Sequence, residues 1–184
     1  MSKRDDITLN WTPENGKLRQ KLYAAAIKKA DAAIKGGFYI EAIALYESML
    51  SDRLEAHIRR QNVRYGGKGT LKTVGNAASA VKSNTSQKRQ PELYQICEEI
   101  AAWANQRNDA VHHVVKLTES NKEETFEARY ESYHTAAKTG RVLFNKFKKI
   151  EEPIIKAWRE AQGLAATKSK KGKKSDKANS KKTK

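Results

Sequence analysis

The densest group of reactive side chains in the sequence lies between Gln106 and His113. An arginine, two amides, a carboxylate and two histidines occur within these eight residues. Arg107 carries a planar, permanently charged guanidinium that suits a phosphate group, and His112 can transfer a proton near neutral pH. Together they supply what cleavage of an RNA phosphodiester needs without a metal ion. The structural alternative is an ordinary surface arginine followed by a partly buried histidine.

Helix geometry limits how Arg107 and His112 can meet. Positions five apart on a straight α-helix lie about 140° apart around its axis. We therefore predict a break at Asn108 and Asp109, because both residue types are strong N-caps. With Asp109 as the cap, His112 would be the third residue of a new helix. The positive end of that helix would favour a neutral imidazole, which can accept a proton.

The charge of the chain indicates a polyanionic partner. The formal net charge of the 184 residues is +16. The last 17 residues hold nine lysines and one aspartate, or +8, so residues 1–167 carry the other +8. A cationic folded body of this kind favours nucleic acid or a ribonucleoprotein as the partner, with an anionic membrane surface as the weaker alternative.

The sequence also predicts the compartment. Cys97 is the only cysteine, so the monomer has no disulfide, as is typical of a reducing cytoplasm. The N-terminal residues lack the apolar core of a secretion signal, and no apolar run approaches 18 residues. We expect a cytoplasmic protein with no membrane partner.

The apolar spacing of the chain predicts helices throughout. An alanine-rich helix runs from Lys17 to Gly36-Gly37 and a strongly amphipathic one begins near Phe38, with a short link that makes the two antiparallel. A shorter helix capped by Thr70 follows, weakened by Gly75. Pro91 opens the helix that leads into the motif.

The last predicted helix is long and carries apolar residues at spacings of three and four. Its face comprises Phe126, Tyr130, Tyr133, Ala137, Gly140, Phe144 and Phe147. Pro153 must kink or restart it. The fold class is an all-α, up-and-down bundle of four to five helices. The expected division is a flexible lead-in over 1–15, a helical domain over 16–163 and a disordered basic tail over 164–184.

Two basic segments are candidates for contacts with nucleic acid. One is the glycine-rich loop after the second helix, and the other is the tail. The candidate residues are Arg59, Arg60, Arg64, Lys68, Lys170, Lys171, Lys173 and Lys174. The loop lacks the residue spacing of a Walker motif, so it does not match a nucleotide-binding loop. The alternative to a contact with nucleic acid is a solvated loop. The aromatic residues stand at helical core spacing and are interpreted as packing rather than as a platform for stacked bases.

The sequence contains no motif typical of a zinc site or of a serine nucleophile. The four histidines, His57, His112, His113 and His134, lack the spacing of a zinc site, and no G-x-S-x-G nucleophile motif occurs. We expect no metal and no cofactor.

The helical hairpin around Gly36-Gly37-Phe38-Tyr39-Ile40-Glu41-Ala42-Ile43, followed by the later helix into Arg107-Asn108-Asp109-Ala110-Val111-His112, resembles the HEPN superfamily. The resemblance covers roughly residues 17–150 and is sharpest at the Arg-x4-His motif, with the polar Asn108 directly after the arginine. The longer connection between Asn62 and Gln90 and the lysine tail depart from the family pattern.

The resemblance implies a metal-independent endoribonuclease in which two protomers bring their motifs together. The RNA 2′-hydroxyl would attack the adjacent phosphate. His112 would act as general base or acid, Arg107 would bind the phosphate, and Asn108 would orient or bond to it. His113 is a candidate second proton carrier or a structural residue, and Asp109 is an accessory candidate. By analogy the family implies a role in toxin–antitoxin systems, defence or phage conflict, with an inhibitor or activator protein as partner.

A second hypothesis uses the same residues without catalysis. The protein would then be a HEPN-like RNA- or ribosome-binding protein, in which Arg107 and His112 bind phosphate or support a homodimer. A third hypothesis is an adaptor whose bundle binds another protein.

Overall fold

The computed structural model describes residues 12–65, 71, 73–112 and 122–163. Over these residues the fold consists of five α-helices: α1 (Pro13–Lys35), α2 (Tyr39–Arg60), α3 (Val74–Ser83), α4 (Pro91–His112) and α5 (Phe126–Ala161). The predicted all-α class is therefore confirmed. Within the described ranges, no helix is long and apolar enough to cross a membrane.

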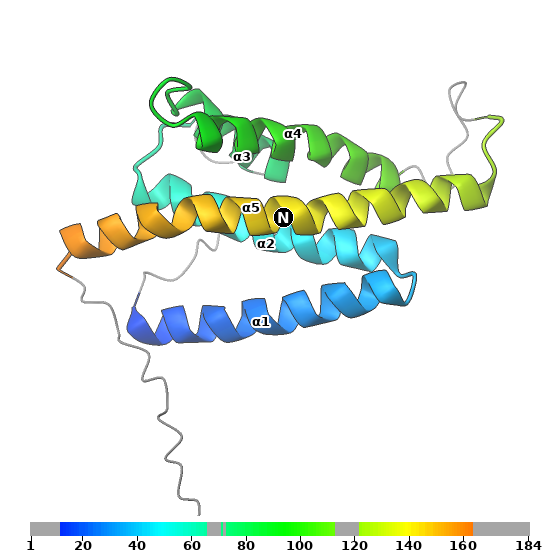
Figure 1. Cartoon of the computed structure of the whole chain (residues 1–184), viewed down its shortest axis with the longest axis horizontal. Helices are drawn as coiled ribbons and strands as arrows, with labels where there is room; N and C mark the ends of the chain where they lie inside the picture. Colours follow the sequence, from blue (N-terminus) through cyan, green and yellow to red (C-terminus); the bar gives the residue numbers. More distant parts are fainter. Residues whose placement is uncertain (1–11, 66–70, 72, 113–121, 164–184) are drawn as a thin grey trace, which may run out of the picture.

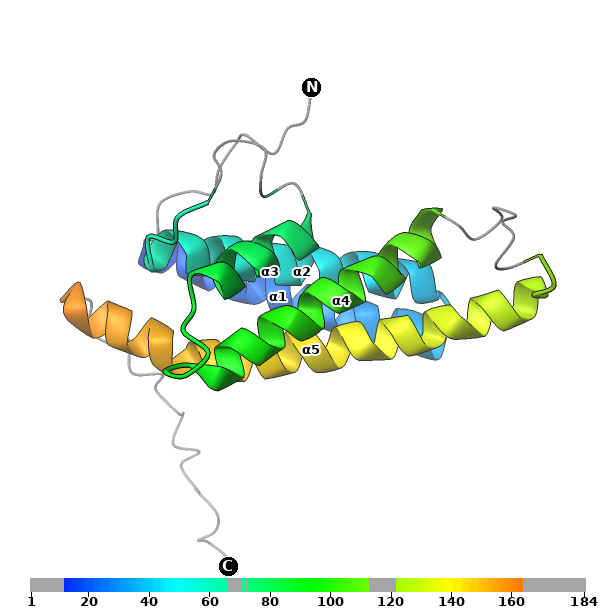
Figure 2. The same cartoon turned by 90° about the horizontal axis from the view of Figure 1, so that it is seen from above.

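The four long helices alternate in direction along the bundle (Figure 1). α2 lies at the centre and packs against α1, α3 and α5, while α4 packs against α3 and α5. Short α3 packs beside α4 on the side away from α5, as Figure 2 shows from above. α1 packs mainly on α2 and touches α5 little, so it is the outlying member of the bundle.

Local capping signals set most of the helix ends. α1 ends in a full Schellman motif: the Phe38 N–H donates to the Ala33 carbonyl at 2.8 Å, and Gly37 adopts a φ of +80°. The predicted end at Gly36-Gly37 and the predicted start of α4 at Pro91 are confirmed.

Three predicted boundaries differ from the structure. α1 begins at Pro13, because the Thr12 hydroxyl accepts a hydrogen bond from the Asn15 N–H at 3.2 Å, so residues 12–15 are not a lead-in. α3 is capped by Thr73 and not by Thr70, which lies outside the described residues. Of the two alternatives predicted at Pro153, the restart is wrong, because α5 continues through this residue to Ala161, while its axis bends toward the C-terminal end (Figure 2).

The core is centred on Trp103 of α4, which packs between α2 and α5. Its indole Nε1 donates to the Ala136 carbonyl of α5 at 2.8 Å. Tyr46, Phe144 and Phe147 are also fully buried, which confirms that these aromatic residues serve packing. Phe38 and Phe126, which the spacing placed on apolar faces, are largely exposed, since each stands where its helix begins.

Gly140 lets α5 approach the central tryptophan. A Cβ at this position would lie 2.7 Å from Cζ2 of Trp103 and 3.2 Å from Cβ of Tyr46. We expect Gly140→Ala to lower the free energy of unfolding by about 1–2 kcal/mol, because overpacking outweighs the gain in helix propensity. Urea unfolding measures this change. Lys138→Ala, on the exposed side of α5, is the control, and an unchanged stability of Gly140→Ala would contradict the expectation.

Candidate functional site

The Arg-x4-His motif lies on one unbroken helix. α4 runs from Pro91 to His112 and includes Asn108 and Asp109, so the predicted break is wrong. Two such residues cost a helix only about 1 kcal/mol together, and the buried Ala104 and Ala110 on either side of them hold the helix against the core. His112 is the last residue of α4 rather than the third residue of a new helix. His112 therefore does not lie at the positive end of a helix, which was the physical reason to expect a neutral imidazole.

Because α4 is continuous, positions 107 and 112 of the motif lie apart from each other. Positions 107 and 112 lie about 140° apart around the helix axis and about 7.5 Å apart along it. One chain therefore does not place both positions on one face of the helix. A single reacting phosphate can therefore contact an Arg107 and a His112 side chain on one face only if a second chain supplies one of them.

Arg107 is held in place by a carboxylate from another helix. Its Nε donates to Oε2 of Glu47 at 2.6 Å, and its Nη2 lies 2.5 Å from the same oxygen. Its Nη1 donates to Oδ1 of Asn108 at 2.6 Å. Both members of the Arg107–Glu47 pair are mostly buried. A guanidinium has five N–H donors, and these contacts engage three of them, which leaves donors for a phosphate oxygen.

Glu47 is a site residue that the sequence analysis missed. It lies on the buried face of α2, beside Tyr46 and Leu50. A glutamate in an otherwise apolar stripe indicates a buried partner of opposite charge. That signal was present in the sequence, but it does not identify an arginine 60 residues later.

A small polar pocket opens beside this arginine. It has a volume of about 380 Å³ and lies between α2, α3 and α4. Its polar walls comprise Glu47, Thr73, Asn76, Ser79, Asn105, Arg107 and Asn108. The N-terminus of α3 lines the pocket, and the helix dipole places a partial positive charge there. An arginine, several amides and a helix N-terminus together can hold one phosphate group.

The other predicted RNA contacts do not gather around this pocket. Arg59, Arg60 and Arg64 lie at or beyond the far end of α2, about 18 Å or more from Glu47 along the helix. Arg59 pairs with Glu55 at 3.9 Å, and Arg64 is exposed. Arg60 is mostly buried and binds Glu151 of α5, so its charge is already engaged.

Several predicted residues lie outside the described part of the chain. They are Lys68, His113, Lys170, Lys171, Lys173 and Lys174. The basic tail that holds the last four also lies there. Their assignment to RNA or to proton transfer stays a prediction.

The one cysteine does not add a nucleophile to the site. Cys97 is buried on α4, and burial raises the pKa of its thiol to about 12. The thiol is therefore protonated at neutral pH, and the reactive thiolate form is not available.

The contacts and distances within this structure are what define the site. Arg107 and Asn108 of α4, together with Glu47 of α2, form a fixed, charged wall of a small polar pocket. Comparison with protein-family models, curated proteins and solved structures gave no match.

Proposed function

We propose that the protein is a metal-independent endoribonuclease of the HEPN type that acts at a site completed by a second copy of the chain. The observation that carries the proposal is the fixed position of Arg107 beside the polar pocket, held by Glu47 and Asn108. Pre-positioned donors stabilise a developing negative charge without reorganising during the reaction. The unbroken α4 supports a composite site, because one chain separates positions 107 and 112 around the helix.

In the proposed reaction the ribose 2′-hydroxyl attacks the adjacent phosphorus. A base takes the proton of that hydroxyl, the bond from phosphorus to the 5′-oxygen breaks, and an acid gives a proton to the leaving oxygen. The products are a 2′,3′-cyclic phosphate and a 5′-hydroxyl. His112 is the proposed proton carrier, and Arg107 stabilises the charge on the phosphoryl oxygens. A role in toxin–antitoxin systems, defence or phage conflict extends the proposal by analogy.

RNA substrates with and without the 2′-hydroxyl at the cleavage site test the proposed reaction. The full chain is incubated in EDTA with a single-stranded RNA, and the cleavage positions and end groups are determined. We expect 2′,3′-cyclic phosphate ends and no cleavage where the ribose at a mapped site is replaced by 2′-deoxyribose. Cleavage at the 2′-deoxy site, or cleavage that disappears in EDTA, would overturn the mechanism.

The Arg107–Glu47 pair also favours a second candidate function, RNA binding without cleavage. Glu47 neutralises much of the charge that Arg107 would offer to a phosphate, as is typical of an arginine with a structural role. In this case RNA binds in a salt-sensitive manner and no cleavage product forms. Truncation of the lysine tail then weakens binding more than His112→Ala.

Glu47→Gln distinguishes the two functions. The amide keeps a hydrogen-bond acceptor but removes the charge that holds Arg107, so we expect cleavage to fall by roughly tenfold while RNA affinity stays equal or rises. Single-turnover cleavage and fluorescence anisotropy measure the two quantities separately. Glu41→Gln, which changes an exposed glutamate on the same helix, is the control. If wild type and Glu47→Gln both bind RNA without cleavage, the binding function is favoured.

A further inference from the structure

The N-terminal half of α1 carries an apolar face that none of the described helices covers. Ala30 and Ala33, in its C-terminal half, are buried against the bundle. Leu18 and Leu22, in its N-terminal half, are 54% and 62% exposed. They are four residues apart, so they lie on one side of the helix, one turn from each other.

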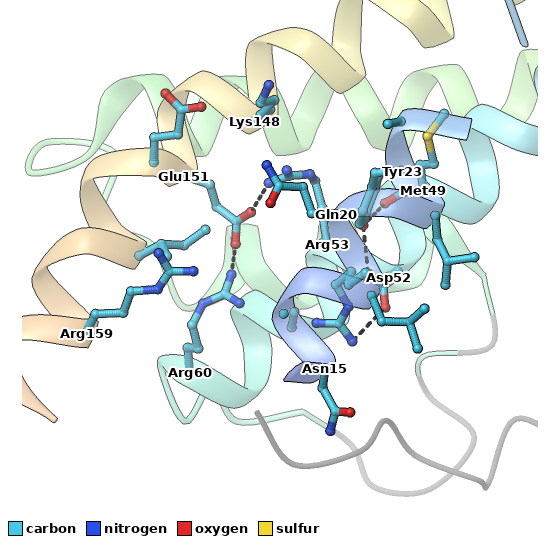
Figure 3. A pocket seen from close by; sticks show the side chains of 18 of the residues that line it. Asn15, Gln20, Tyr23, Met49, Asp52, Arg53, Arg60, Lys148, Glu151 and Arg159 are labelled. Carbon is cyan, nitrogen blue, oxygen red and sulfur yellow. Dashed lines mark hydrogen bonds and ion pairs between the residues drawn. The ribbon is translucent and has the colours of Figure 1, made fainter. Parts of the chain in front are cut away.

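A large groove begins at this uncovered face (Figure 3). It has a volume of about 1490 Å³ and lies between α1, the second half of α2 and the C-terminal part of α5. Leu18, Leu22, Ile27, Ile155 and Trp158 contribute to its apolar lining. The α1 residues that line it run from Asn15 to Ile27, which is about 18 Å of helix, or just over three turns.

The floor of the groove holds a buried carboxylate surrounded by cations. Nη1 of Arg53 donates to Oε2 of Glu151 at 2.9 Å, Nη2 of Arg60 binds Oε1, and Nδ1 of His57 lies 3.7 Å from Oε1. Burial raises the pKa of Glu151, but the nearby His57 imidazole and the charges of Arg60 and Arg53 outweigh this effect and hold the pKa below its usual value. Glu151 is therefore ionised and balances one of the two guanidinium charges.

The groove has more positive than negative charge. Six of its lining residues are lysine or arginine and four are aspartate or glutamate, a surplus of two positive charges. Asp52 already binds Arg19 at 3.2 Å and accepts a hydrogen bond from Tyr23 at 2.7 Å. Lys148 also lines the groove, and its side chain is exposed. An occupant that carries carboxylates would balance this surplus of positive charge.

We propose that this groove binds an amphipathic helix of a partner protein, with leucine-like residues along one stripe and Asp or Glu beside that stripe. Its length and its paired leucines match three turns of a helix laid along α1, the usual form of helix-in-groove recognition. Its volume exceeds the roughly 300–1000 Å³ of ordinary small-molecule sites, which favours a peptide over a single phosphate. The proposal does not depend on ribonuclease activity, because the groove lies on the α1 side of α2 and the Arg107 pocket on the α3 and α4 side.

Selection from a display library of helical peptides of random sequence tests the proposal on the full-length protein. We expect the enriched peptides to carry apolar residues at positions i, i+3 or i+4, and i+7, with acids beside them. Their Kd should rise at least tenfold for both Leu22→Glu and Lys148→Glu. The matched controls are Val142→Glu and Lys138→Glu, an exposed apolar residue and an exposed lysine of α5 outside the groove, which should leave Kd unchanged. Circular dichroism and the Tm of each variant establish that it is folded.

Other occupants give distinct results, each of which would overturn the proposal. If no peptide is enriched, or if enriched peptides bind Leu22→Glu and wild type equally, the groove does not bind a helix. If wild type is a dimer by light scattering and Leu22→Glu alone is a monomer, a second copy covers the groove. If pyrophosphate or a short RNA raises the Tm of wild type but not of Lys148→Glu, and no acidic peptide is enriched, the groove is an anion site. None of these measurements requires RNA cleavage.

Discussion

Arg107→Ala and His112→Ala are each expected to lower the rate of RNA cleavage by roughly 10²-fold or more. Removing a pre-positioned donor or a proton carrier from an active site typically costs this much. Arg107 is fixed by Glu47 and Asn108, so the loss should appear in the single-turnover rate more than in RNA affinity. Cleavage in EDTA, followed by separation of the products, measures it.

Two variants serve as matched controls, because each removes a residue of the same type from a position outside the motif. Arg141→Ala removes an exposed arginine that pairs with Asp31, and His134→Ala removes a histidine that pairs with Glu131. Both lie on α5 and should cut RNA at the wild-type rate. Wild-type cutting by either Arg107→Ala or His112→Ala would remove the motif from the mechanism.

A mixture of the two inactive variants tests the composite site. If one chain supplies Arg107 and the other supplies His112, mixed dimers of Arg107→Ala and His112→Ala contain one complete set and regain part of the activity. If each chain uses its own pair, mixing restores nothing, because every chain lacks one of the two residues. Co-expression with two different affinity tags isolates the mixed dimer for the assay.

Glu151→Ala is expected to lower the free energy of unfolding by about 3–5 kcal/mol, because it leaves buried cations without their counter-charge. Arg53, Arg60 and His57 all contact the Glu151 carboxylate. Urea unfolding monitored by tryptophan fluorescence measures the change. Glu152→Ala removes the exposed neighbouring acid and should stay within about 0.5 kcal/mol of wild type. An equally small effect of Glu151→Ala would mean that water screens the cluster.

The same carboxylate predicts a dependence of stability on pH. Its pKa in the folded protein lies below its usual value, because His57, Arg60 and Arg53 outweigh the effect of burial. The carboxylate therefore adds stability that is fully present above its unfolded pKa of about 4.3 and is lost as the pH falls through the folded value. Unfolding free energies from pH 7 down to pH 3 should fall less steeply for Glu151→Gln than for wild type. If the unfolding free energies of wild type and Glu151→Gln depend equally on pH, the lowered pKa of Glu151 is contradicted.

Short-range signals in the sequence determined the helices and most of their ends. The Gly36-Gly37 pair specifies the Schellman motif of α1, because glycine adopts the left-handed conformation without steric cost. Pro91 fixes the start of α4, and spacings of three and four identified the residues that surround Trp103. These features depend on neighbours within a few residues, so the sequence contains the information needed to predict them.

The tertiary structure decided how the motif residues are held. Asn108 and Asp109 favour a helix break locally, but burial of Ala104 and Ala110 outweighs that preference, and α4 continues to His112. Glu47 and Arg107 meet across 60 residues of chain, and Arg60 reaches Glu151 across 91.

The sequence by itself thus determined an all-α chain with an excess of positive charge and one reactive motif. Only the packing of the helices decided that Arg107 is a fixed, half-neutralised group beside a small pocket, and that α1 leaves Leu18 and Leu22 uncovered over a cationic groove. The physical reason is the range of the interactions. Helix propensity and capping act over one turn, whereas a buried ion pair or an uncovered face depends on which helices pack together.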